Sequence, residues 1–130
     1  MTEKNQIYKC NVCGNVIDVL HQAGGELVCC GKPMELQQEK TADDGKEKHV
    51  PVVVVEGNKV SVKVGSIPYP MTEEHYIEWI EINMVDAGRI AKKYFKPGDV
   101  AEVEFHSRGG EIKIRAYCNL HGLWESGSWV

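Results

Sequence analysis

The chain has 130 residues, enough for one ordinary domain or two very small ones. Its composition, 42% hydrophobic and 26% charged, excludes a disordered chain, and its longest apolar run (residues 50–55) is far shorter than the roughly 20 residues of a membrane span. The net charge of −4 argues against a general nucleic-acid-binding protein. Because the N-terminal residues lack the pattern of a secretory signal, we expect a cytoplasmic protein without a membrane or nucleic-acid partner.

Residues 1–36 are predicted to form a small domain that needs a metal, because so short a segment cannot bury a sufficient core. Four of the five cysteines lie here, as Cys10-x2-Cys13 and, after fifteen further residues, Cys29-Cys30. Clustered cysteines in a reducing compartment indicate a metal site rather than disulfides. Four thiolates suit either Zn²⁺ or iron, and the spacing leaves both open. The adjacent second pair is unusual, since an ordinary zinc ribbon has a second Cys-x2-Cys there.

A polar stretch, residues 37–48, is predicted to be a linker. Residues 49–130 alternate short apolar segments with turn signals, which predicts an antiparallel β-sandwich. Three segments alternate strictly, with one apolar face each: residues 60–64, 101–105 and 111–117. The valine run at residues 52–55 predicts a more buried strand, and residues 76–84 predict another. Only residues 86–95 have any helical pattern, and it is short and uncapped.

Three histidines and the fifth cysteine lie in predicted loops of this second unit: His49, His75, Cys118 and His121. Neutral imidazoles with one thiolate form a nitrogen-rich site with one soft donor, which suits redox-active iron. Cys118 and His121 give the stronger signal, because ligand-type residues three apart after a strand are a recurrent metal-site pattern. We interpret the other two histidines, His21 and His106, as ordinary surface or strand-end residues.

Taken together, these motifs resemble a known family. The Cys-x2-Cys-Gly motif at residues 10–14 and the Cys-Cys-Gly motif at 29–31 resemble the desulforedoxin centre. Glu-Lys-His-Val-Pro at 47–51, Pro-Met followed by a histidine within 70–75, and Cys-Asn-Leu-His-Gly at 118–122 resemble the catalytic half of desulfoferrodoxin. That family comprises two-iron superoxide reductases of anaerobic microbes. The resemblance covers essentially the whole chain, with the motifs in the family's order.

The resemblance implies an all-β protein with two domains. The first would be a small desulforedoxin-like domain stapled by metal, and the second an immunoglobulin-like antiparallel β-sandwich that carries catalysis. The implied limits are residues 1–36 for the first domain, 37–48 for a linker and lid loop, and 49–130 for the catalytic domain. The family further implies a homodimer that receives electrons from rubredoxin or a similar small donor and delivers them to superoxide.

The resemblance also implies two iron ions per chain. The first would be an iron tetrathiolate held by the four N-terminal cysteines: Cys10, Cys13, Cys29 and Cys30. The second would have His49, His75 and His121 as equatorial ligands and Cys118 as the axial thiolate. Glu47 and Lys48 would lie beside its open sixth position, where Lys48 supplies a positive charge that attracts the superoxide anion.

One position departs from the family pattern. Tyr69 stands where the family has its fourth equatorial histidine, so the match supplies three of four imidazoles. Three alternatives stay open: Tyr69 binds iron as a phenolate, it turns away and leaves room for water, or it is a deliberate substitution. We therefore expect a superoxide reductase that Tyr69 impairs or alters. The other hypotheses are a rubredoxin-like electron-transfer iron protein with a degraded second site, and a zinc-stapled interaction module.

Overall fold

The computed structural model describes residues 1–40, 50–64 and 71–129. The chain forms two compact units, Met1–Gln38 and Glu39–Val130. Among the described residues, all regular secondary structure is β-strand, which confirms the predicted all-β class. In this part of the chain, no helix is long and apolar enough to cross a membrane.

The first unit consists of two small antiparallel sheets. One has the strand order β2-β1-β5, and the other is the hairpin β3-β4. The strands are β1 (Ile7–Lys9), β2 (Val16–Asp18), β3 (Val28–Cys29), β4 (Lys32–Pro33) and β5 (Glu35–Leu36). Its buried apolar residues are only Ile7, Cys10 and Val19 among those described. So small a core agrees with the prediction that this unit depends on a metal.

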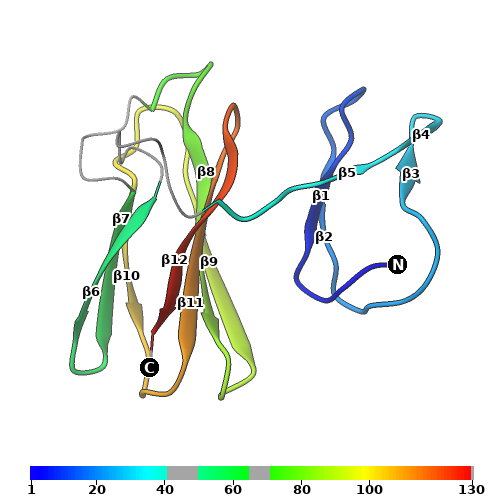
Figure 1. Ribbon diagram of the computed structural model, residues 1–130. Coiled ribbons are helices and arrows are strands. Elements are labelled where there is room, and N and C mark those ends of the chain that lie inside the picture. The colour runs from blue at the N-terminus through cyan, green and yellow to red at the C-terminus, as the bar shows by residue number, and fades with distance from the viewer. Residues whose placement is uncertain (41–49, 65–70, 130) are drawn as a thin grey trace. The chain divides into compact units, whose positions relative to one another are not determined.

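The second unit is a sandwich of two antiparallel sheets (Figure 1). The three-stranded sheet has the order β10-β7-β6, with β6 (Pro51–Glu56), β7 (Lys59–Val64) and β10 (Glu102–His106). The four-stranded sheet has the order β12-β11-β8-β9, with β8 (Ile77–Met84), β9 (Arg89–Tyr94), β11 (Ile112–Cys118) and β12 (Gly122–Trp129). The predicted antiparallel sandwich is therefore confirmed.

The core lies between these sheets, where the predicted alternation places the apolar side chains. On β7 the three buried residues are Val60, Val62 and Val64, and on β11 they include Ile112, Ile114 and Ala116. Side chains alternate between the faces of a strand, so every second residue points inward. Cys118, at the end of β11, lies on the same inward face as these residues and is itself part of the core.

One local prediction is wrong, and one ambiguous segment is resolved by the structure. The valine run is an edge strand rather than a buried one, and Val52, Val54 and Val55 are 42–50% exposed. Its apolar residues face both sides, but the neighbouring sheet covers only one. Residues 89–94, within the segment whose helical pattern was short and uncapped, form strand β9: all six pair with β8, and Gly88 adopts the left-handed conformation that the connecting turn requires.

A buried ionic cluster lies on the outer face of the four-stranded sheet. Arg115 donates two hydrogen bonds to the Glu81 carboxylate, at 2.7 and 3.0 Å, and a third to Glu39 at 3.2 Å. Glu81 is 1% exposed and Arg115 5%. Lys92 completes the cluster with its amine 3.6 Å from Glu81. Arg115 thus fastens the first residue of this unit, Glu39, to the middle of the sheet.

Candidate metal centres

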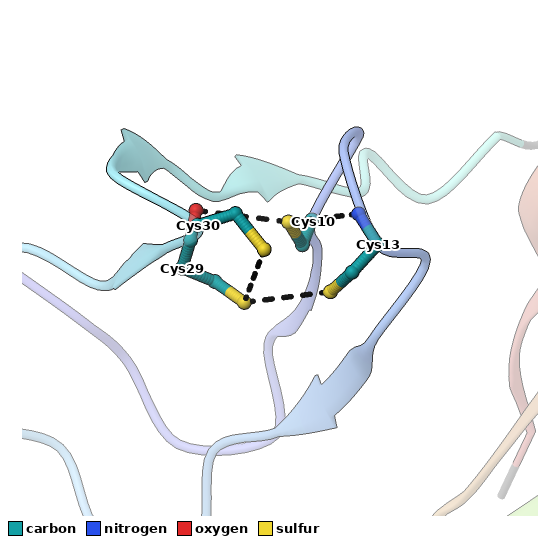
Figure 2. A group of neighbouring side chains, drawn as sticks. All are labelled: Cys10, Cys13, Cys29 and Cys30. Carbon is teal, nitrogen blue, oxygen red and sulfur yellow. Dashed lines mark hydrogen bonds between the residues drawn. The ribbon is translucent and has the colours of Figure 1, made fainter.

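The four N-terminal cysteines converge in the first unit, as Figure 2 shows. Cys10 follows β1 and Cys13 lies in the next turn, whereas Cys29 ends β3 and Cys30 begins the turn to β4. All four sulfur atoms lie within 4.8 Å of one another. The Cys13–Cys29 and Cys29–Cys30 sulfur pairs are 3.5 and 3.9 Å apart. None of the five cysteines of the chain forms a disulfide.

These separations fit a tetrahedral metal. Sulfur ligands at about 2.3 Å from a metal form a tetrahedron with edges of about 3.8 Å, which the two sulfur pairs bracket. The adjacent ligands fit because Cys30 adopts a left-handed backbone, with φ of 54°. A non-glycine residue in this conformation costs about 1–2 kcal/mol, and the turn here uses it to bring neighbouring side chains to the same side. Gly31, also left-handed at φ 74°, completes that turn.

Within this cluster, Cys10 loses its proton more readily than Cys29 and Cys30 do. The backbone N–H of Cys13 donates to the Cys10 sulfur at 3.4 Å, and this bond together with that of Val12 lowers the pKa of Cys10 to about 6. Side-chain hydrogen bonds with other cysteines, that with Cys13 the largest, and burial raise the pKa of Cys30 to about 12 and also raise that of Cys29. At neutral pH, Cys29 and Cys30 are therefore thiols in the metal-free protein.

Metal binding at this cluster should therefore release protons. Both Cys29 and Cys30 must lose a proton to become ligands, so the apparent Zn²⁺ affinity of metal-free protein should rise with pH, by at least about 100-fold per unit near neutrality. Calorimetric titration with Zn²⁺ in buffers of different ionisation enthalpy counts the protons. A His75→Ala/His121→Ala background removes two donors of the other cluster. Binding with no proton release would contradict this account.

A second cluster forms at one end of the sandwich, from His75, Cys118 and His121. His75 lies two residues before the start of β8, Cys118 is the last residue of β11, and His121 lies in the turn to β12. Cys118 pairs with Ile77 across the sheet, after a register shift between Tyr117 and Cys118. This pairing places the segment before β8 beside the end of β11, so the three donor atoms lie within 4.8 Å of one another.

The donor set fits a metal with one soft and several nitrogen ligands. Cys118 is completely buried, and its sulfur accepts the backbone N–H of His121 at 3.4 Å. The Nδ1 of His121 is 3.7 Å from the same sulfur. The imidazoles of His75 and His121 are 4.8 Å apart and nearly perpendicular, at 72°. A buried sulfur with imidazoles toward solvent suits iron with a thiolate on its protein side.

Four of the predicted site residues lie outside the residues that the structure describes: Glu47, Lys48, His49 and Tyr69. Their roles remain predictions. The two histidines interpreted as ordinary residues are exposed, and His106 lies 3.5 Å from the Glu104 carboxylate.

The structure adds two residues to the surroundings of the second cluster. The Lys40 amine donates to the His121 carbonyl at 2.7 Å and lies 5.1 Å from the centre of the Trp124 ring. Asn119 uses its side-chain amide to contact the chain on both sides of His75. Lys40 carries no signal in the sequence, where it is one charge in a polar stretch. Asn119 stands between two candidate ligands, but only its place in the fold reveals which backbone groups it binds.

Two family models match this chain. The one described as desulfoferrodoxin matches residues 41–127, and the one described as desulfoferrodoxin, N-terminal domain, matches residues 2–37. Together they cover both units and both clusters. The resemblance inferred from the motifs is therefore confirmed along nearly the whole chain.

Individual proteins give the same result. A desulfoferrodoxin homolog of Archaeoglobus fulgidus is 58% identical over 127 residues, which cover 98% of this chain and 100% of that protein. A desulfoferrodoxin of Syntrophotalea carbinolica is 51% identical and covers 97% of this chain and 98% of its own. The crystal structure of the superoxide reductase from Treponema pallidum superposes with a TM-score of 0.74 at 29% identity, covering 94% of this chain and 97% of that one.

Proposed function

The chain belongs to the desulfoferrodoxin family, and on that basis we propose that it is a superoxide reductase. The reaction is the one-electron reduction of superoxide, O2•⁻ + e⁻ + 2H⁺ → H2O2. The observation that carries the proposal is the convergence of His75, Cys118 and His121 at one end of the sandwich. An electron-transfer protein with a degraded second site would not need these three donors in place.

We propose that both clusters hold iron. The four cysteines of the first unit would hold an iron tetrathiolate, and His75, Cys118 and His121 would hold the second iron together with His49. When bound, that iron supplies the electron that superoxide takes up. The electron would come from rubredoxin or a similar small donor, and the protein would act as a homodimer in the cytoplasm, removing superoxide from an anaerobe.

Residues of the second unit would tune the iron and attract superoxide to it. Cys118 supplies the thiolate, and the His121 N–H that it accepts draws electron density from the sulfur and moderates its donation. Lys48 would attract the superoxide anion by a local positive charge, against a net charge of −4 for the chain. Glu47 would lie beside it, at the position where superoxide arrives.

Metal analysis with superoxide kinetics tests the proposal. Purified protein should contain two irons per chain, be coloured in the oxidised form by the tetrathiolate, and reduce superoxide in pulse radiolysis. One iron per chain without superoxide reduction would indicate the electron-transfer protein instead. Zinc alone, in a colourless preparation, would indicate an interaction module and rule out both redox functions.

Replacing Tyr69 with histidine should raise the rate of superoxide reduction. A phenolate is anionic, so it stabilises Fe(III) and places negative charge where superoxide must arrive, whereas imidazole does neither. Mutating a residue that only hydrogen-bonds to a metal ligand changes activity by about 10–100-fold. Because Tyr69 stands at the position of a ligand itself, we expect a gain of at least about tenfold. Pulse radiolysis measures the rate, and the ferric absorption of the second site should shift with it.

The matched control is Tyr94→His, at a tyrosine that is 67% exposed on β9. It should leave both the rate and the ferric spectrum unchanged. Identical superoxide kinetics in Tyr69→His and the parent would show that Tyr69 does not limit the reaction.

A further inference from the structure

Asn119 forms three hydrogen bonds to the segment that carries His75. Its side-chain oxygen accepts the backbone N–H of Tyr76 at 2.9 Å, and its side-chain nitrogen donates to the carbonyl of Glu74 at 3.0 Å. Its own backbone N–H donates to the Tyr76 carbonyl at 3.2 Å. The two side-chain bonds thus hold the residues immediately before and after His75.

The regular sheet cannot provide these bonds. Strand β8 begins at Ile77, and the pairing with β11 shifts between Tyr117 and Cys118, so the ladder ends at the Cys118–Ile77 pair. A side-chain amide carries the same donor and acceptor as a peptide group. Asn119 therefore extends the pairing by one step past the end of β11, to the residues that flank His75.

We infer that Asn119 is a positioning residue that fixes the His75 imidazole toward the Cys118 sulfur for iron binding. This inference rests on the proposed function, because it assigns a role within that same site. The other contacts of this segment include one backbone bond from Asn119 and a turn in which Thr72 and His75 exchange backbone hydrogen bonds at 2.9 and 3.2 Å. That turn fixes the segment on itself but does not fix it to β11.

The two side-chain hydrogen bonds of Asn119, to Tyr76 and Glu74, form a clamp on the His75 segment, and this clamp requires an amide. A carboxylate at this position accepts the Tyr76 N–H but cannot donate to the Glu74 carbonyl. It would also place a negative charge close to the thiolate, since the Asn119 oxygen is 4.0 Å from the Cys118 sulfur. Alanine removes both side-chain bonds without adding a charge. The two substitutions therefore test the clamp in different ways.

The experiment uses the full-length, iron-loaded protein and measures how much iron each variant retains against a ferrous chelator. Asn119→Ala should lose the second iron at a chelator concentration about 10–100-fold lower than the parent. Its ferric second-site absorption should shift, while the tetrathiolate absorption, an internal reference, stays unchanged. The matched control is Asn58→Ala, an exposed asparagine in the β6–β7 turn, which should behave like the parent.

Parent-like iron retention and ferric absorption in Asn119→Ala would overturn the inference. If that variant does not fold, Asn119→Asp decides by the same criterion, because it keeps one of the two side-chain bonds. Iron retention also separates this inference from the proposed function. If the parent protein holds two irons but does not reduce superoxide, only the proposed function is refuted. The role of Asn119 would still be tested by comparing iron retention in Asn119→Ala and the parent.

Discussion

Replacing Cys118 with serine should abolish superoxide reduction and empty the second iron site. The Cys118 side chain is fully buried and provides the only sulfur of the described cluster. A hydroxyl is a much poorer ligand than a thiolate for redox-active iron. Mutating a residue that only hydrogen-bonds to a metal ligand lowers metal affinity or activity by about 10–100-fold, and losing the ligand itself should cost more. Iron analysis should fall from two irons per chain to one, and pulse radiolysis should show no reduction above background.

The reciprocal variant, Cys13→Ser, is the control. It should remove the tetrathiolate colour while the second site keeps its iron, because the two clusters belong to separate units. If Cys118→Ser retained both the second iron and the superoxide kinetics of the parent, the assignment of this cysteine as a ligand would be wrong.

Replacing Glu81 with alanine should destabilise the Glu39–Val130 unit by about 3–5 kcal/mol. Arg115 is 5% exposed and has two hydrogen bonds to Glu81, so the variant leaves a buried guanidinium without its bidentate carboxylate partner, although the bond to Glu39 remains. Removing one partner of a buried pair costs far more than the pair contributes, because the remaining charge stays desolvated. The double variant Glu81→Met/Arg115→Leu should recover most of the loss.

Urea unfolding followed by tryptophan fluorescence measures this effect in one unit. All three tryptophans lie in the Glu39–Val130 unit, so the signal does not report on the first unit. The matched control is Glu104→Ala, which breaks an exposed pair with Lys59 at 3.4 Å and should cost about 0–1 kcal/mol. Equal losses for the two glutamates would show that burial does not govern the Arg115 cluster.

Several elements could be predicted from the sequence because their cause is local. The alternation in residues 60–64 and 111–117 identifies the inward face of a strand wherever that strand pairs, since successive side chains point to opposite faces. The cysteine pairs could be recognised because ligands within a few residues of each other meet in a single turn. The family motifs then supplied the two-domain architecture.

Other features depend on which segments meet. Residues 86–95 were ambiguous because a short apolar pattern fits a helix or a strand, and pairing with β8 decided for the strand. The valines at 52–55 were predicted to be buried, but burial depends on whether a second layer covers that face. β6 lies at a sheet edge, where only one face is covered.

For this protein, the sequence alone indicated the candidate metal donors, the all-β class and the family, because these follow from residue types and short spacings. Only the tertiary structure decided which distant groups become neighbours. His75 meets Cys118 and His121 because of the β8–β11 register, Asn119 reaches past the end of that register, and Arg115 finds Glu81 across the same pair of strands. The physical reason is that hydrogen bonds and ion pairs act over a few ångströms, and only packing brings residues more than thirty positions apart within that range.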